Sequence, residues 1–368
     1  MYIYQQAAWP HFTWDTPSIS KLLVAVRHKQ GRLVGRMESL GFSLREEAVL
    51  QTLTLDVIKS NEIEGEILNA EQVRSSIARK LGMGIGALPP ADRHIEGVVE
   101  MLWDTTQNFS LPLSEDRLFG WQAALFPTGR SGLVKIAVGS WREPSTGPMQ
   151  VVSGAMGQEI VHFEAPTANR GSAEMDAFIQ WFNQNNDHDA VLKAALAHLW
   201  FVTIHPFDDG NGRIARAIAD LQLARSDNSS QRFYSMSAQI QLERKRYYDI
   251  LEKTQKGDLD ITDWLEWFLA CLDRALSATE TTLDSVLRKS RYWAHFNQKD
   301  LTARQKLMLN KLLDGFEGKL NTSKWAKMTK VSTDTALRDI LNLVKQEVLE
   351  KEDSGGRSTS YRLVELES

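Results

Sequence analysis

The chain has 368 residues and a formal net charge of −4, with 42% hydrophobic and 24% charged residues, values that are ordinary for a globular protein of two or three domains. The negative net charge argues against binding of nucleic acid over the whole surface, and no run of about 18 apolar residues is present to cross a membrane. The single cysteine, Cys271, cannot form an intrachain disulfide and the N-terminus lacks a signal-peptide pattern, so we expect a cytoplasmic protein without a membrane partner.

The N-terminal region, residues 1–92, is predicted to be helical. Hydrophobic residues recur at near-helical spacing up to Met37, and helical patterns continue over 43–80 with a break at Gly65. A stretch rich in glycine and proline, residues 80–92, then predicts a loop.

The next region, residues 93–275, is predicted to be a second helical domain with one exception. Apolar residues alternate from Val134 to Val138, and turn signals precede a second short apolar run. This pattern predicts a β-hairpin around 134–152 on the surface of the domain. Residues 276–300 are predicted to form a long linking helix.

The last region, residues 301–368, is predicted to be a separate module. Three helical segments are followed by a strand, a Gly-Gly turn and a second strand, an order that resembles a winged helix. Within 301–364 there are 12 Lys and Arg residues against 8 Asp and Glu residues, a net charge of +4 by subtraction. Lys324, Lys327 and Lys330 share one helix face, which either binds phosphates or is an ordinary solvated face.

The segment HPFDDGNGRIAR, residues 205–216, concentrates residues that suit a phosphate site. Pro206 disfavours helical geometry at the residue before it, which predicts that a helix ends at His205. Gly210 and Gly212 free the loop amides to converge on an anion. The helix that follows adds the partial positive charge and the unpaired N–H groups of its N-terminus.

Charged residues complete this pattern. Arg213 and Arg216 lie three positions apart on the first turn of the second helix, where two guanidinium groups can clamp a polyphosphate. Asp209 precedes that helix and can hold a Mg²⁺ ion that bridges phosphates. Taken singly, each of these residues is more often structural than functional. Their order over the whole segment favours a nucleotide site.

At this point the sequence resembles a known family. The segment 205–216 matches the Fic-domain signature His-x-Phe-x-Asp/Glu-Gly-Asn-Gly-Arg-x-x-Arg at every fixed position, and the resemblance covers roughly residues 50–275. It implies a mainly α protein, with a helical Fic fold and a small β-hairpin flap, to which the C-terminal winged helix is added. It also implies transfer of AMP from ATP to a hydroxyl side chain of a target protein, with release of pyrophosphate. Gly212 favours AMP transfer, because related toxins that act as kinases have Lys at this point.

The resemblance assigns a role to the positions of this segment. His205 resembles the general base that deprotonates a Ser, Thr or Tyr of the target, and Asp209 resembles the Mg²⁺ ligand. The nucleotide-binding set of the segment is Asp209, Gly210, Asn211, Gly212, Arg213 and Arg216. Within it, Asn211 and the loop amides resemble the α-phosphate holders, Arg213 a β-phosphate contact and Arg216 a γ-phosphate contact.

Two further segments resemble parts of Fic sites. The segment YYDILEKTQKGD, residues 247–258, is similar to the segment that lines the adenosine pocket, and an amphipathic core helix is the alternative interpretation. Its candidate residues are Tyr248, Leu251 and Gln255, the last of which stands where Asn is usual. The predicted hairpin at 134–152 resembles the flap that pairs with an extended target segment by strand addition. The docking candidates there are Lys135, Ile136 and Val138.

The segment SNEIEGE, residues 60–66, fits the pattern Ser/Thr-x-x-x-Glu-Gly/Asn of the family's inhibitory helix, about residues 50–65 here. The pattern falls on Ser60, Glu64 and Gly65. The resemblance makes Glu64 a salt-bridge partner of Arg216, which would withdraw this arginine from the γ-phosphate and repel the nucleotide. A helix that ends at a glycine, with exposed glutamates, is the structural alternative.

We therefore expect a protein adenylyltransferase that uses ATP and Mg²⁺, modifies itself and a hydroxyl-bearing target protein, and is autoinhibited by Glu64. Two alternatives stay open: a DNA-binding transcriptional regulator that uses the winged helix with a Fic sensor domain, and a Fic enzyme that acts mainly in de-AMPylation. The presence of both His205 and Asp209 argues against a sensor without catalysis. A homodimer is the expected assembly, and DNA is a candidate partner of the C-terminal module.

Overall fold

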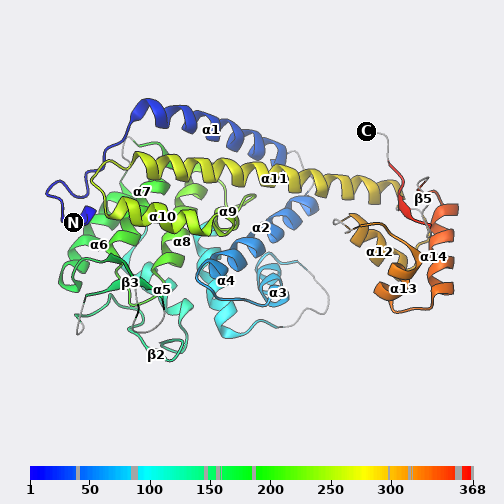
Figure 1. Cartoon of the computed structure of the whole chain (residues 1–368), viewed down its shortest axis with the longest axis horizontal. Helices are drawn as coiled ribbons and strands as arrows, with labels where there is room; N and C mark the ends of the chain where they lie inside the picture. Colours follow the sequence, from blue (N-terminus) through cyan, green and yellow to red (C-terminus); the bar gives the residue numbers. More distant parts are fainter. Residues whose placement is uncertain are drawn as a thin grey trace. The chain divides into compact units, whose positions relative to one another are not determined.

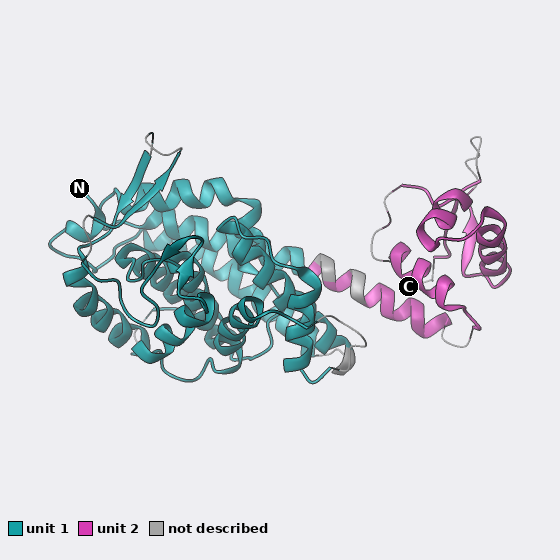
Figure 2. Cartoon of the chain, turned by 90° about the horizontal axis from the view of Figure 1, so that it is seen from below, with its two compact units in different colours: residues 1–279 teal, residues 280–368 magenta. Residues whose placement is uncertain are grey.

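The computed structural model describes residues 1–38, 42–83, 90–144, 148–154, 158, 160–184, 188–296, 299–313, 316, 318–352 and 359–365. Part of the predicted Gly/Pro-rich loop, at 84–89, and the Gly-Gly turn predicted near the C-terminus lie outside the described residues. The described chain is mainly helical with small two-stranded antiparallel sheets, which confirms the predicted mainly α class (Figure 1). It divides into two compact units, residues 1–279 and 280–368 (Figure 2). None of the helices in these described ranges is long and apolar enough to cross a membrane.

The first unit begins with a short 3₁₀ helix, η1, and continues with a series of α-helices. The elements of its first part are η1 Ile3–Gln5, α1 Thr16–Glu38, α2 Phe42–Ile63, α3 Ala70–Lys80, α4 Arg93–Gln107, α5 Glu115–Leu125 and α6 Ala168–Asn183. The later helices are α7 Ala190–Ile204, α8 Asn211–Asp227, α9 Met236–Leu242, α10 Arg244–Gln255 and α11 Thr262–Phe296. The predicted inhibitory helix at about 50–65 is therefore the second half of α2, and Glu64 lies just past its end.

Side-chain caps determine where several of these helices begin. Asn69 accepts hydrogen bonds from the backbone N–H groups of Glu71 and Gln72 at the start of α3. Ser114 accepts one from the N–H of Arg117 at the start of α5. Short polar side chains favour such positions because they satisfy N–H groups that have no partner within the helix.

Helices α7 and α8 form the centre of the first unit (Figure 1). Every residue of α7 from Val191 to Ile204 is buried, as expected for a helix that is apolar on nearly all sides. Helix α8 is buried from Arg213 to Ala224. The segment 205–210 joins these two helices, so the packed core holds both of its ends.

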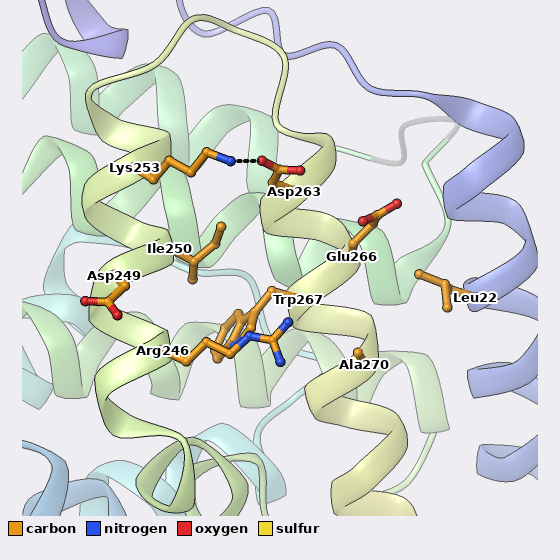
Figure 3. Close-up of a pocket in the computed structure, with 9 residues that line it drawn as sticks. All are labelled: Leu22, Arg246, Asp249, Ile250, Lys253, Asp263, Glu266, Trp267 and Ala270. Carbon is orange, nitrogen blue, oxygen red and sulfur yellow. Dashed lines mark hydrogen bonds and ion pairs between the residues drawn. The ribbon is translucent and has the colours of Figure 1, made fainter.

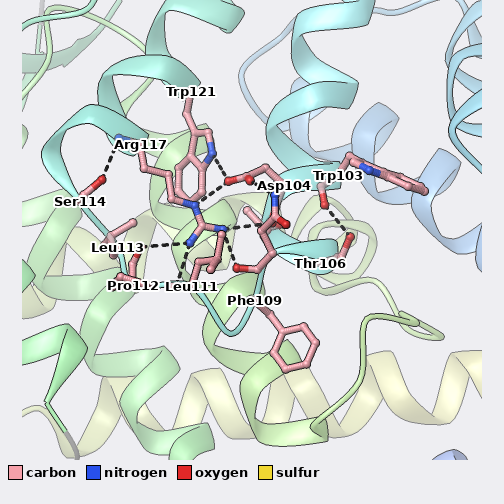
Figure 4. Close-up of polar contacts among 12 residues, drawn as sticks. Trp103, Asp104, Thr106, Phe109, Leu111, Pro112, Leu113, Ser114, Arg117 and Trp121 are labelled. Carbon is pink, nitrogen blue, oxygen red and sulfur yellow. Dashed lines mark hydrogen bonds and ion pairs between the residues drawn. The ribbon is translucent and has the colours of Figure 1, made fainter.

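Polar contacts of Arg117 hold α5 against α4 and the loop between them (Figure 4). Its Nε donates to Asp104 Oδ2 at 2.6 Å, and Trp121 Nε1 donates to the same oxygen at 2.8 Å. The terminal nitrogens of Arg117 donate to the backbone carbonyls of Asp104, Asn108 and Leu111. These contacts fix α5, whose C-terminal end borders the loop between α7 and α8.

The strands correct the predicted hairpin at 134–152. The strands that the described part of the first unit contains are β1 Arg130–Ser131, β2 Val134–Lys135, β3 Gln150–Ser153 and β4 Ile160–Glu164. β1 pairs with β2 and β3 pairs with β4, so the two predicted strands do not pair with each other. The reason is Gly132, whose φ of 56° allows a two-residue turn directly before Val134. Ile136 and Val138 lie outside the strands.

The predicted linking helix at 276–300 is not a separate element. Helix α11 runs without interruption from Thr262 to Phe296 and includes the boundary between the units after residue 279. Its first part lies along α1, where Lys29 Nζ and Asp273 Oδ2 form an ion pair at 2.7 Å.

In its described residues, the second unit contains the end of α11, three shorter helices and one antiparallel strand pair. After α11, these elements are α12 Ala303–Leu313, α13 Thr322–Thr329, α14 Thr333–Lys345, β5 Leu349–Lys351 and β6 Tyr361–Leu363. They pack around buried residues that include Met308, Trp325, Ile340 and Val348. The order of elements is the one predicted for 301–368, and the winged-helix comparison itself stays a prediction.

Candidate active site

His205 directly follows α7 and has a left-handed backbone conformation, with φ 53° and ψ 57°. This backbone conformation is uncommon for residues other than glycine and persists only where neighbouring groups stabilise it. Arg142 stabilises it here: its Nε donates to His205 O at 2.8 Å, and its backbone N–H donates to Pro206 O at 2.9 Å. The predicted end of the helix at His205 is confirmed, and Arg142 is a supporting residue that sequence analysis missed.

One imidazole nitrogen of His205 forms a hydrogen bond with the backbone. Its Nδ1 lies 3.3 Å from Val202 O, and because a carbonyl can only accept, Nδ1 carries the proton. Nε2 therefore keeps a lone pair. Burial lowers the pKa of His205 to about 4, although the hydrogen bond to Val202 opposes this shift. The ring is neutral at physiological pH, which is the form that a general base requires.

Asn211 closes the loop, which differs from its predicted role as an α-phosphate holder. Its Oδ1 accepts from Phe207 N at 3.0 Å, and its Nδ2 donates to Phe207 O at 2.8 Å. Asn211 is 2% exposed and Phe207 is fully buried, so the side chain braces the loop from inside the core. The N–H groups of the first turn of α8 have no partner within the helix, so they are available to bind an anion at the end of this loop.

Asp208 and Asp209 attach the loop to the chain around β1 and β2. Asp208 Oδ2 accepts from the backbone N–H of Ala137 at 2.8 Å. Asp209 Oδ1 accepts from Gly210 N at 2.6 Å, and its Oδ2 accepts from the hydroxyl of Ser131. Ser131 and Asp208 were not predicted as site residues. Neither residue has a motif signal of its own, since both act through distant backbone or side-chain partners.

The two glycines of the segment serve different purposes. Gly210 precedes α8 with a φ of 90°, which strongly favours glycine. A Cβ atom at Gly212 would collide with Glu64 Oε1. The carboxylate of Glu64 thus lies directly against the first turn of α8.

Arg216 and Glu64 form the contact that the sequence predicts. Arg216 Nη2 lies 2.7 Å from Glu64 Oε1, and the Arg216 side chain is only 3% exposed. Ser60 also takes part, because Arg216 Nε donates to its hydroxyl at 3.0 Å and Arg216 Nη2 donates to its carbonyl at 2.9 Å. Gly65 has a φ of 85° and makes the turn that directs Glu64 toward α8. The structure brings Ser60 and Glu64 together around one guanidinium, and Gly65 forms the turn beside them.

Arg213 has a separate set of partners that the sequence analysis did not predict. Its Nη1 lies 2.9 Å from Glu66 Oε2 and 3.3 Å from Asn61 Oδ1. Glu66 Oε1 in turn lies 2.6 Å from Nε2 of His94, in the first turn of α4. Its guanidinium also lies over the ring of Phe126, 5.0 Å from the centroid.

The residues predicted to line an adenosine pocket divide into two groups. Tyr248 lies beside the site, and its hydroxyl donates to Ile63 O at 3.3 Å and to Glu64 Oε2 at 3.4 Å. Leu251 and Gln255 are 6% and 5% exposed, and Gln255 Nε2 donates to a side chain of α7 at 3.3 Å. For these two residues the structure favours the alternative interpretation, a buried face of a core helix.

The predicted docking residues are likewise divided. Lys135 is exposed at the end of β2, whereas Ile136 and Val138 are half-buried, and Ile136 N donates to the carbonyl of Gly129 at 3.2 Å. The residues that point outward at this turn are Leu133 and Val134, which are 93% and 67% exposed. The alternation of apolar residues did not predict these outward-pointing side chains, because β2 is too short to continue to Val138.

A cavity of about 710 Å³ opens beside the candidate site. It is lined by both phosphate-site and inhibitory residues, among them Glu64, Glu66, His94, Asp209 and Arg213. A second cavity of about 460 Å³ lies between α1, α10 and α11, with the ion pair of Lys253 and Asp263 at one end (Figure 3). The second cavity contains no residue of the segment 205–216. The first is the candidate nucleotide site because Asp209 and Arg213 of that segment line it.

Two family models match this chain. Residues 112–223 match the model described as Fic/DOC family, and residues 2–83 match a domain of unknown function, DUF4172.

Curated relatives match only part of the chain. The protein adenylyltransferase Fic of Drosophila grimshawi is 35% identical over 115 residues, which is 31% of this chain and 21% of the relative. That of Aedes aegypti is 33% identical over 104 residues, 28% of this chain and 19% of the relative. The chain thus spans about a fifth of the length of these relatives.

Solved structures show the same fold. A Fic family protein from Desulfovibrio desulfuricans G20 has a TM-score of 0.55 at 22% identity, over 97% of this chain and 98% of that protein. A Fic domain containing signaling protein from Bacteroides thetaiotaomicron VPI-5482 has a TM-score of 0.51 at 21% identity, over 73% of this chain and 97% of that one.

Proposed function

Given that this chain is a Fic-domain protein, we propose that it is a protein adenylyltransferase that transfers AMP from ATP to a Ser, Thr or Tyr hydroxyl of a target protein. The observation that carries the proposal is the position of a neutral His205 imidazole at one end of an amide-rich loop, with Arg213 and Arg216 on the first two turns of the helix that follows. Such a helix start binds phosphate, and the imidazole can accept a proton.

The residues of the chain divide the reaction between them. His205 Nε2 takes the proton of the incoming hydroxyl, because Nδ1 is already protonated and bonded to Val202 O. The hydroxyl oxygen then bonds to the α-phosphorus, and the bond from that phosphorus to the oxygen of the β-phosphate breaks. Pyrophosphate leaves. Arg213 and Arg216 serve as partners for its negative charge once they are released from their carboxylates.

The residues present fit a magnesium ion that is completed by substrate. The described residues hold no group of three or more His, Cys, Asp or Glu side chains that could bind a metal alone. Asp209, which lines the cavity, supplies one carboxylate, and Mg²⁺ is commonly held by one or two carboxylates together with phosphate oxygens. When bound, the ion neutralises charge on the phosphates.

The contact between Glu64 and Arg216 supports autoinhibition as part of the proposal. Arg216 cannot bind a terminal phosphate while Glu64 occupies it, and the carboxylate lies where a phosphate would approach Gly212. A bound triphosphate would also meet a like charge at this point. We therefore expect the wild-type chain to have low activity.

The test is automodification with ATP labelled on either the α- or the γ-phosphate. The full-length Glu64→Gly variant should incorporate α-label at a rate well above wild type and no γ-label, since AMP transfer retains only the α-phosphate. The double variant Glu64→Gly, His205→Ala should incorporate neither. Glu62→Gln is the matched control, because Glu62 pairs with Lys59 of the same helix and should leave the wild-type rate unchanged.

Three results would contradict the proposal. Incorporation of γ-label would indicate a kinase, and equal α-labelling of wild type and Glu64→Gly would remove the inhibitory role of Glu64. Unchanged labelling after loss of His205 would remove it as the base.

A further inference from the structure

We infer that Glu66 is a second inhibitory carboxylate, which holds Arg213 away from phosphate in the way that Glu64 holds Arg216. The inference rests on the proposed function of the site and extends it to a residue outside the Ser60, Glu64 and Gly65 pattern. Both carboxylates come from the turn that follows α2, and both guanidinium groups come from the first two turns of α8.

The contacts of Arg213 leave it little freedom. Its side chain is 7% exposed, with Nη1 bound by Glu66 Oε2 at 2.9 Å and by Asn61 Oδ1 at 3.3 Å. Phe126 covers the flat side of the guanidinium. A phosphate that approaches Arg213 through the cavity therefore has to replace Glu66, or it adds its charge beside an unmoved carboxylate.

Glu66 is itself held in place from two sides. Its Oε1 lies 2.6 Å from His94 Nε2, so the two carboxylate oxygens are divided between His94 and Arg213. Its backbone N–H donates to Asn61 O at 3.0 Å, which closes the turn around Gly65. The hydrogen bond from His94 lowers the pKa of Glu66, and the carboxylate is charged at neutral pH.

Glu64 and Glu66 should weaken the binding of different phosphates, because the two arginines that they hold contact different phosphates. In the proposed pose Arg213 contacts the β-phosphate and Arg216 the γ-phosphate. Removal of the Glu66 charge should therefore strengthen the binding of any nucleotide with a β-phosphate, including ADP. It should not affect AMP, which has no phosphate at that position.

The experiment compares the dissociation constants of AMP, ADP and ATP by calorimetric titration with Mg²⁺ on the full-length chain. Glu66→Gln keeps the size of the side chain and removes its charge. We expect ADP and ATP to bind about 2- to 5-fold more tightly to this variant, the upper part of the range for an ion pair with one exposed partner, with AMP unchanged. Glu62→Gln is the control on the same segment and should leave all three constants unchanged.

A second variant tests the support that His94 gives. His94→Ala keeps the Glu66 charge but removes its second partner, so ADP should bind more tightly than to wild type and less tightly than to Glu66→Gln. ADP affinity that is unchanged or weaker in Glu66→Gln would overturn the inference, the weaker result indicating that Glu66 positions Arg213 for phosphate. Equal gains for AMP and ADP would also overturn it. Failure of Glu64→Gly to incorporate α-label would instead reject the proposed function, since these affinities do not depend on transfer.

Discussion

Substitution of Glu64 by Gly should reduce the stability of the free protein and raise its affinity for ATP by similar amounts. The contact that is removed is a charge-assisted hydrogen bond of 2.7 Å to an Arg216 side chain that is 3% exposed, while Glu64 itself is 33% exposed. Such bonds contribute about 1.5–3 kcal/mol, and the exposure of Glu64 places this one near the lower end. Arg216 keeps both bonds to Ser60, so the buried charge retains partners.

The same free energy opposes ATP binding in wild type, because the nucleotide has to break this contact. A difference of about 1.5–2 kcal/mol corresponds to roughly 10- to 30-fold tighter binding of ATP to Glu64→Gly. Chemical denaturation gives the loss of stability without nucleotide, and calorimetric titration gives the gain in affinity.

A Glu64→Gln variant separates charge from volume. Glutamine keeps atoms against Gly212, where Glu64 Oε1 now lies, and can still accept a hydrogen bond from Arg216. We expect its ATP affinity to lie between those of wild type and Glu64→Gly. If Glu64→Gly is as stable as wild type and binds ATP no more tightly, the contact between Glu64 and Arg216 does not restrain the site and the reasoning is refuted.

Three further predictions concern groups around the same loop. Asn211→Ala should destabilise the protein by about 2–4 kcal/mol, because it leaves both backbone groups of Phe207 without their partner inside the core; chemical denaturation measures this. Burial sets the pKa of His205 at about 4, so the kcat/KM of Glu64→Gly should show no loss attributable to this base between pH 8 and about pH 5. Glu66 raises the pKa of His94 above its ordinary value, so the ion pair stabilises the fold fully below the unfolded pKa, about 6.5, and this contribution is lost as the pH rises through the folded pKa. The Tm difference between wild type and His94→Gln should therefore be largest at acidic pH and decrease at alkaline pH.

Each of these predictions has a contradicting result. Asn211→Ala with wild-type stability would show that the loop is held elsewhere. A decline of kcat/KM as the pH falls through about 6.5 would show that His205 is solvated during the reaction. This decline should be absent with a more acidic target hydroxyl, which does not need the base. A Tm difference between wild type and His94→Gln that grows with pH would contradict the ion pair of His94 with Glu66. Asp92 and Arg213 are the other charges near His94.

Features that depend on neighbours along the chain could be predicted from the amino-acid sequence alone. Pro206 ends α7 at His205, and the glycines that follow allow the turn into α8. The mainly helical class and the order of elements in 301–368 follow in the same way from apolar periodicity and turn residues. The pairing of Glu64 with Arg216 was also predicted, but only through the family resemblance, since no local rule connects positions 152 residues apart.

Which side chains face the site, in contrast, depends on how the helices pack. Asn211 lies within the phosphate motif yet bonds to Phe207, while Leu251 and Gln255 are buried against the core. Glu66 meets Arg213 although no motif includes it. The physical reason is that hydrogen bonds and ion pairs between distant segments depend on how helices pack, and that packing brings the end of α2 against the start of α8. A sequence pattern records which chemical groups are available, whereas the folded core determines which of them meet.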